Sequence, residues 1–266
     1  MEKYEHCLYK SALFYHLKSE KINENLNMDD GVLLYNIGII LTHMDYANIA
    51  NHYLKKAQIK MKEHQIIKFD LNVRWNLALN RGITGIPEES RKLLVSYLRE
   101  VEQKKDNSET SGVIHHKIGL IYASEGNYDK ALECFVIASQ YFKKGSEAYI
   151  YNQCHTVLAS FLSNKYSETL ECIEEGLSMA IEGTLWHLQL TTIKHLMTLD
   201  KSESIEYMTK VAIPRLKEYG KNLLVIECYE RLSSYHAKTT GYKTALKYKD
   251  LALKLNNQLM RGELQK

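Results

Sequence analysis

The chain has 266 residues, of which 45% are hydrophobic and 25% are charged, which is an ordinary composition for a water-soluble globular protein. Its 35 Lys and Arg against 32 Asp and Glu give a formal net charge of +3, too small to indicate nucleic acid or an anionic membrane as a partner. No apolar run approaches the roughly 20 residues that span a bilayer, the N-terminus lacks a signal peptide, and the five scattered cysteines fit reduced thiols, so we expect a cytoplasmic protein.

The first predicted element is an apolar-rich helix from about residue 3 to residue 21. A polar, Asn-rich connection follows at 22–28, and Asp29 and Asp30 fit the N-cap of the next helix. The opening helix resembles the second helix of a repeat whose first helix is missing. We therefore expect residues 1–28 to form a leading partial repeat and its connection, in a chain that begins inside a longer architecture.

From residue 29 to residue 266, one pattern of small and large apolar residues recurs. The third unit shows it best, because Gly119, Ala131 and Ala138 are small where two helix backbones would cross, and Phe135 beside them is large. These residues fall at fixed positions of a tetratricopeptide (TPR) unit, a helix–turn–helix repeat. The eighth position of the unit recurs at Gly38, Ala78, Gly119, Val157, Ile193 and Ser233. We therefore predict an all-α, right-handed α-solenoid of about six TPR-like repeats.

Two local features of the repeats carry further expectations. The second unit, 70–103, is degenerate, and we expect a longer turn at 82–87 with Pro87 in the first turn of the second helix. Four tyrosines occupy large positions of the repeat, so we expect core packing rather than a surface on which bases stack. They are Tyr122, Tyr128, Tyr166 and Tyr242.

The first helices of the repeats line the inner, concave wall of such a solenoid, where extended peptides or partner helices bind. The residues that we expect to contact a ligand there are Tyr35, Asn36, Trp75, Asn76, His116, Lys117, Tyr151, His155 and Arg231. Asn36 and Asn76 share the sixth position in adjacent repeats, and an amide side chain offers both a donor and an acceptor to one peptide unit. Alternatively, both amides face solvent in the groove, and the sequence leaves these two interpretations open.

The order of the repeats, the segment Phe161-Leu162-Ser163 followed by 172–177, and the ending at 259–263 resemble the C-terminal domain of the bacterial cytosolic pheromone receptors of the Rap and NprR type, in the RRNPP group. The resemblance covers nearly the whole chain. It implies that the concave face captures a short signalling oligopeptide and that Asn36 and Asn76 hold its backbone. Related receptors often have Asn where this chain has Lys117, so this lysine would instead meet a peptide carboxylate or an acidic side chain.

In receptors of this group the effector part precedes the repeats, as a helical bundle that binds a response regulator or as a helix-turn-helix domain. Neither is visible in this sequence. The resemblance therefore implies a ligand-sensing domain that controls transcription or a response-regulator phosphorelay, such as one for sporulation, through such a partner or a fused or missing domain. It leaves a homodimer open. With no basic recognition helix, we expect no direct nucleic-acid binding by this chain, and no membrane partner.

The sequence gives little support to the hypothesis that this protein is an enzyme. The chain has no HExxH, Walker loop, GxGxxG or GxSxG motif, and His187 and His195 share a helix face without an acidic partner. We therefore expect no catalysis, no metal and no cofactor. A TPR scaffold for protein–protein interaction without a peptide ligand is the main alternative. A clamp for a chaperone tail fits worse, because only Asn76, and in part Lys117, match its residues.

Overall fold

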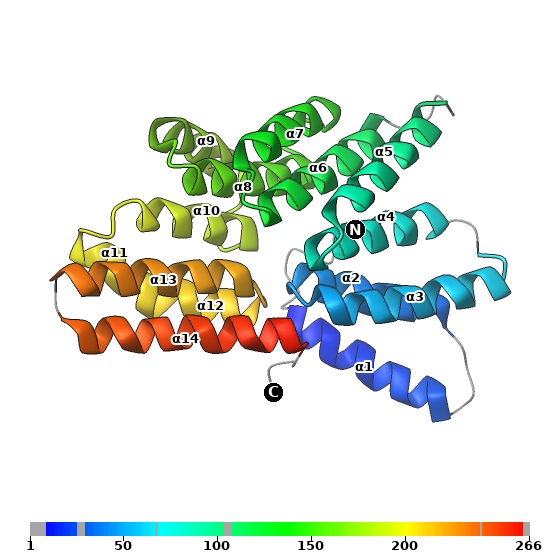
Figure 1. Ribbon diagram of the computed structural model, residues 1–266, viewed down its shortest axis with the longest axis horizontal. Coiled ribbons are helices and arrows are strands. Elements are labelled where there is room, and N and C mark those ends of the chain that lie inside the picture. The colour runs from blue at the N-terminus through cyan, green and yellow to red at the C-terminus, as the bar shows by residue number, and fades with distance from the viewer. Residues whose placement is uncertain (1–8, 26–29, 67–68, 104–107, 240, 263–266) are drawn as a thin grey trace.

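The computed structural model describes residues 9–25, 30–66, 69–103, 108–239 and 241–262, and within these ranges the protein is helical with short turns and has no strand (Figure 1). The all-α fold predicted from the sequence is confirmed. The helices are α1 (Tyr9–Asn25), α2 (Gly31–His43), α3 (Ala47–Glu63), α4 (Asp70–Thr84), α5 (Pro87–Gln103), α6 (Ser108–Ser124), α7 (Tyr128–Tyr141), α8 (Glu147–Leu162), α9 (Tyr166–Met179), α10 (Leu185–Leu196), α11 (Ser202–Tyr207), the π-helical η2 (Met208–Ala212), α12 (Ile213–Glu218), α13 (Asn222–Thr239) and α14 (Tyr242–Arg261).

Consecutive helices pair as helix–turn–helix units, α2 with α3, α4 with α5, α6 with α7, α8 with α9, and α13 with α14. In the fifth unit, α10 packs on the continuous stretch α11–η2–α12. Small residues set the distance between paired helices: a Cβ on Gly119 would lie 2.5 Å from Cε1 of Phe135, and one on Gly38 would lie 2.7 Å from Cγ of Leu54. Since real atoms do not approach so closely, the glycines are required at these crossings.

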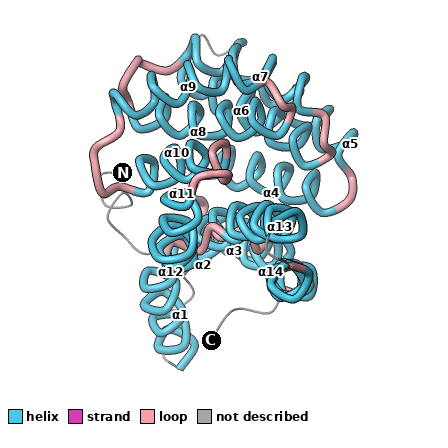
Figure 2. The backbone as a smooth tube through the Cα atoms, turned by 90° about the vertical axis from the view of Figure 1, so that its left-hand side faces the viewer, coloured by secondary structure: helices cyan, strands magenta, loops and turns pink. Residues whose placement is uncertain are grey.

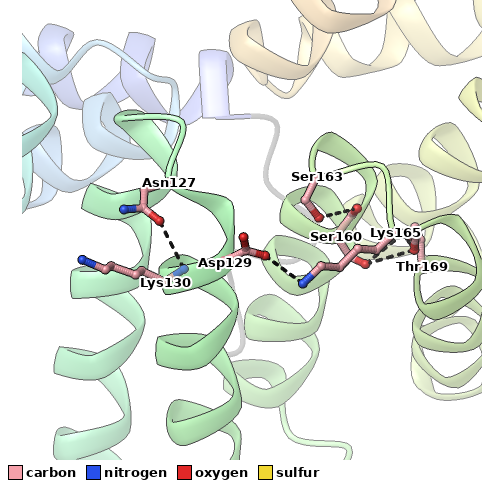
Figure 3. A network of polar contacts seen from close by, with 7 residues as sticks. All are labelled: Asn127, Asp129, Lys130, Ser160, Ser163, Lys165 and Thr169. Carbon is pink, nitrogen blue, oxygen red and sulfur yellow. Dashed lines mark hydrogen bonds and ion pairs between the residues drawn. The ribbon is translucent and has the colours of Figure 1, made fainter.

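Capping groups and ion pairs join the turns of neighbouring units (Figure 3). The side chain of Asn127 accepts a hydrogen bond from the backbone N–H of Lys130 at 3.4 Å, which caps the first turn of α7. Two residues away, the carboxylate of Asp129 lies 2.8 Å from Nζ of Lys165, at the start of α9 (Figure 3). The hydroxyl of Thr169 lies 2.8 Å from the carbonyl oxygen of Lys165. The third and fourth units are thus tied together at their turns.

Several local expectations were wrong. Helix α1 continues to Asn25, so the predicted connection at 22–28 is shorter than expected, while residues 3–8 lie outside the described ranges. Only two residues separate α4 from α5, because α4 continues to Thr84, and the longer turn predicted at 82–87 is absent. Tyr166 and Tyr242, expected in the core, are 44% and 77% exposed. Each is the first residue of its helix, at the turn end of the unit, where neighbouring helices do not cover it.

Other local expectations were met. Asp30 accepts hydrogen bonds from the N–H groups of Val32 and Leu33, both at 3.0 Å, as expected for an N-cap, whereas Asp29 lies outside the described residues. Pro87 is the first residue of α5. The division of the chain at residue 29 stays a prediction, although α1 packs against α2 and its Tyr9 and Leu13 belong to the largest apolar core.

The two ends of the solenoid meet, so the helix pairs form a closed ring rather than an open arc. In Figure 1, α13 and α14 (orange and red) run toward α1, α2 and α3 (blue), and Figure 2 shows the stack of pairs from the side. We call the junction the end-to-end contact, defined by residues 43–45 after α2 and residues 221–223 at the start of α13. Its three hydrogen bonds run from Lys221 Nζ to the carbonyl oxygen of His43 (3.2 Å), from Asn222 Nδ2 to that of Met44 (2.8 Å), and from Leu223 N–H to Oδ2 of Asp45 (3.0 Å).

Apolar packing continues across the same junction. Met44 covers Gly220, where a Cβ would lie 2.7 Å from Cγ of Met44. One core cluster includes residues of the first and last helices together, among them Tyr9, Leu41 and Leu255. One apolar cluster of the core therefore crosses the junction, and the ring partly encloses its concave wall.

Candidate functional site

The closed ring has a cavity of about 350 Å³ on its inner side, which is partly open to solvent. Its walls come from the first helices of the first four units, from α7 and from α13. Most of the lining is apolar, with Leu79, Ile83, Leu120, Leu158, Leu162 and Leu224. The polar and charged groups gather where the ends of the solenoid meet, and they include His43, Asp45, Tyr151, His155 and Lys221.

Tyr151 on α8 lies at the centre of the polar end, among aromatic rings from other helices. Its ring centroid is 5.8 Å from that of His43 on α2, 5.0 Å from His116 on α6 and 4.8 Å from His155, one turn away on α8. Trp186 at the start of α10 contacts it at 5.1 Å. Four helices thus contribute to one aromatic cluster beside the cavity.

The three histidines of this cluster are neutral at physiological pH. Burial lowers the pKa of His43 to about 3, that of His116 to about 4, and that of His155 well below its ordinary value. His116 Nδ1 lies 2.8 Å from Oδ1 of Asn152, whose own Nδ2 donates to the carbonyl oxygen of Phe135 at 2.9 Å. This arrangement assigns the proton of His116 to Nδ1 and leaves Nε2 as an acceptor. Within the described residues, Nε2 of His116 and of His155 have no hydrogen-bond partner.

Charged groups at the cavity are arranged in pairs. Burial raises the pKa of Asp45 to about 6, and the nearby Lys221 ammonium opposes this shift. Glu227, at the edge of the cavity, accepts a hydrogen bond from Nε of Arg231 at 2.6 Å. The Arg231 guanidinium also lies 4.6 Å from the ring centroid of Phe161. Arg231 is therefore engaged by an acid and an aromatic ring, and it reaches the cavity only through Glu227.

A second polar group lies on the neighbouring helices α4 and α6. Lys117 Nζ donates to Oδ1 of Asn76 at 2.8 Å, and Asn76 Nδ2 donates to the carbonyl oxygen of Asn72 at 2.7 Å. The ammonium also lies 5.9 Å from the ring centroid of Trp75. Burial lowers the pKa of Lys117 to about 8.

The structure thus divides the predicted ligand contacts into groups. Tyr151 and His155 line the cavity, and His116 packs against both. Trp75, Asn76 and Lys117 form the second polar group, away from the cavity lining. Of the two remaining N-terminal candidates, Tyr35 packs on Phe69 at 5.5 Å and Asn36 is partly buried on α2. Ligand contact by any of these residues stays a prediction.

Sequence reasoning missed Asp45 and Lys221, whose charged groups lie at the cavity. Both lie in turns, and the repeat pattern assigns inward-facing positions only within first helices. Asp45 has a positive φ of 67°, which makes it an unusual residue, but the sequence contains no signal that a segment 178 residues away would pack against it.

The part of the chain that the structure describes contains neither a metal-binding cluster nor a membrane-spanning helix. No group of three or more His, Cys, Asp and Glu side chains there is arranged to hold a metal ion. None of the described helices is both long and apolar enough to cross a bilayer.

Solved structures of helical-repeat proteins superpose on this chain. The structure of NprR in complex with its cognate peptide NprX matches with a TM-score of 0.77 at 21% identity, over 94% of this chain and 71% of that chain. This chain has the fold of NprR. The apo form of the quorum sensor NprR from B. thuringiensis gives a TM-score of 0.63 at 20% identity, over 94% and 72% of the two chains. A Rap protein complexed with Competence and Sporulation Factor gives 0.73 at 13% identity, over 96% and 72%.

The resemblance to the NprR and Rap receptors expected from the sequence is thereby confirmed at the level of the fold. No family model matches the sequence, and no curated protein matches it. Of the two NprR structures, the peptide complex is more similar in shape to this chain than the apo form is.

Proposed function

We propose that this chain is the ligand-sensing domain of a bacterial quorum-sensing regulator, which binds a short signalling peptide on the inner side of the ring and controls an effector. The observation that supports this proposal best is the partly enclosed, mostly apolar cavity, with the unpartnered imidazole nitrogen of His155 on its wall. NprR and the Rap protein, which share the fold, are known as peptide complexes.

The chemistry of the cavity suits an apolar peptide side chain flanked by backbone. Leu79, Leu120 and Leu158 offer aliphatic surface, and burial of apolar ligand area contributes about 25 cal/mol for each Å². Nε2 of His155, on the wall, and Nε2 of His116, an acceptor behind it, are both buried without a hydrogen-bond partner among the described residues. A buried acceptor without a partner costs free energy, so a ligand that donates to it binds more tightly.

Ligand binding and ring closure are linked in this proposal, because the cavity has walls from both ends of the solenoid. His43 and Asp45 belong to the first unit, whereas Lys221 and Leu224 belong to the last. A ligand that contacts both ends favours the closed ring over any more open form by the difference in its affinity for the two. The change in shape would then control the effector, either transcription or a response-regulator phosphorelay, through a response regulator or a helix-turn-helix domain.

A second candidate function is a protein–protein scaffold without a peptide ligand. It is favoured less, because a partner helix needs a long open groove, whereas the inner wall forms a partly enclosed cavity of about 350 Å³. In neither function does the chain act as an enzyme, and we place both in the cytoplasm.

Filling the cavity tests the proposal. Leu158→Trp adds a larger ring to the cavity wall and should weaken binding of the best member of a pentapeptide library at least tenfold, measured by calorimetry. The matched control is Leu170→Trp on α9, where the side chain is 43% exposed and outside the cavity. Wild-type affinity in the Leu158→Trp variant would remove the cavity from the binding site, and tight binding of an intact protein partner without any peptide binding would favour the scaffold.

A further inference from the structure

We propose that Lys117 is a subsite for a carboxylate of the ligand, and that a carboxylate bound there releases Asn76 to bind the peptide backbone. The proposal rests on the peptide binding proposed above and adds the chemistry that the peptide must carry. It concerns the second polar group, on α4 and α6, rather than the cavity.

Lys117 is partly buried and has no acidic partner among the described residues; Arg81 and Lys238 on the inner helices have none either, but both are exposed. Arg231 is paired with Glu227 at 2.6 Å, Lys194 with Glu174 at 2.6 Å, and Lys221 lies near Asp45. Among the described residues, the one hydrogen-bond acceptor of Lys117 Nζ is the neutral amide oxygen of Asn76. A partly buried ammonium that faces only a neutral acceptor is incompletely compensated, and a carboxylate is the group that complements it.

The surroundings of Lys117 strengthen an interaction with an anion. The ring of Trp75 lies 5.9 Å from the ammonium, and the nearby His43 and His116 are neutral, so they neither repel the ammonium nor attract an anion themselves. A charged pair formed in such a low-dielectric setting is stronger than one at the surface. The structure thus offers a single, uncompensated cation in a neutral wall.

Asn76 is nearly buried and holds Lys117 on its amide oxygen. Its Nδ2 donates to the carbonyl oxygen of Asn72 at 2.7 Å, its Oδ1 accepts from Lys117 at 2.8 Å, and the residue is 5% exposed. An amide oxygen has two lone pairs, but in this state the nearly complete burial of Asn76 leaves a peptide N–H little access to Oδ1 beside the ammonium. When a carboxylate draws the ammonium away, Oδ1 becomes free to accept a peptide N–H. Binding through Asn76 is therefore conditional on an acidic group in the ligand.

Asn36 provides the internal comparison. Asn36, Asn76 and Lys117 hold the sixth position of the first, second and third units. The residue that follows Asn36 at this position, in the next unit, is therefore the amide Asn76 and not a lysine. A contribution from Asn36 to binding should therefore not depend on whether the peptide is acidic.

The test uses three sets of pentapeptides against the full chain, read by affinity selection and then by calorimetry on the best members. One set has a free C-terminal carboxylate and no Asp or Glu, the second has an amidated C-terminus and one Asp or Glu, and the third is amidated and has no acid. We expect at least tenfold tighter binding of a carboxylate-bearing set than of the third. The tighter of the first two sets identifies the source of the carboxylate.

Variants then separate the two steps. Lys117→Met should weaken acidic peptides at least tenfold and bring the uncharged set up to similar affinity, whereas Lys117→Arg should keep the preference for acid. In wild type, Asn76→Ala should weaken only the acidic peptides, but in the Lys117→Met background it should also weaken the uncharged set. Asn36→Ala should affect all sets equally. Circular dichroism melts verify that each variant folds.

Equal binding of the three sets to the wild-type protein would overturn this inference and leave the peptide-binding function standing. No binding of any set would overturn both. The wild-type comparison needs no variant, so the inference is tested even where a substitution at Lys117 prevents folding.

Discussion

His43, His116 and His155 remain uncharged in this protein because aromatic rings of several helices enclose them. The sequence predicted the repeat positions of His116 and His155, and it predicted that Lys117 points inward. The partners of these residues were not readable, because a repeat pattern tells which way a side chain points but not what it meets on the next helix. The bond from Lys117 to Asn76 joins residues 41 apart in two different units.

The neutral histidines give the folded protein a pH dependence. In the unfolded chain these three imidazoles bind protons near pH 6.5, whereas in the folded chain they stay neutral. The unfolded state therefore binds more protons as pH falls from 7 to 5, and the free energy of unfolding decreases. The loss should be about 1–2 kcal/mol for each of the three histidines. Asp45 acts in the opposite direction, because its folded pKa of about 6 stabilises the protein as pH falls through that value, by about 1 kcal/mol.

Urea midpoints at pH 7 and pH 5 measure this effect. His155→Gln should reduce the pH dependence by about one third of the total from the histidines. His64→Gln, at an exposed position after α3, is the matched control and should leave it unchanged. Equal stability at the two pH values would show that these imidazoles are not buried as described.

At the scale of elements, the sequence predicted most of what the structure contains. The positions of Gly38, Gly119 and Ala131 identify the helix crossings, because only small residues let two backbones approach so closely. The exact ends of α1 and α4 were less predictable. Both helices continue beyond the predicted boundaries, through residues that suit a turn as well as a helix, and packing rather than local preference decides between the two.

Overpacking one crossing tests the register. Ala131 is fully buried between α6 and α7, so Ala131→Leu should reduce the free energy of unfolding by about 1–3 kcal/mol. Ala237→Leu, at an exposed position of α13, introduces the same side chain without a clash. Thermal melts of both variants provide the measurement, and a melting temperature of Ala131→Leu equal to that of the control would contradict the crossing.

At the scale of the whole molecule, the ring closure is the feature that the sequence did not predict. The repeat pattern describes contacts between neighbouring units, whereas the end-to-end contact joins residues 178 apart in the chain. It depends on the sum of the small rotations between successive units, which no single motif encodes. The site changes with it, because an open arc would present a groove, whereas the closed ring forms a partly enclosed cavity.

Weakening the end-to-end contact should open the ring. Asn222→Ala removes the hydrogen bond to the carbonyl oxygen of Met44 and leaves that oxygen unpaired, which costs about 1–3 kcal/mol. We expect a larger radius of gyration by small-angle X-ray scattering and a faster association rate of the peptide with the protein. Asn256→Ala, exposed on α14, is the control. An unchanged radius of gyration together with an unchanged association rate would show that this bond does not hold the ring closed.

Because the two ends meet, the position of the junction depends on the geometry of every unit in the ring. Each unit adds a small rotation to the stack, so an error of a few degrees in any one of them is carried forward to the last helix and shifts Asn222 away from Met44. A defect far from the junction, such as a misplaced crossing between α6 and α7, is thus converted into a displacement at one point. The junction closes only when every unit between its two sides has the correct geometry.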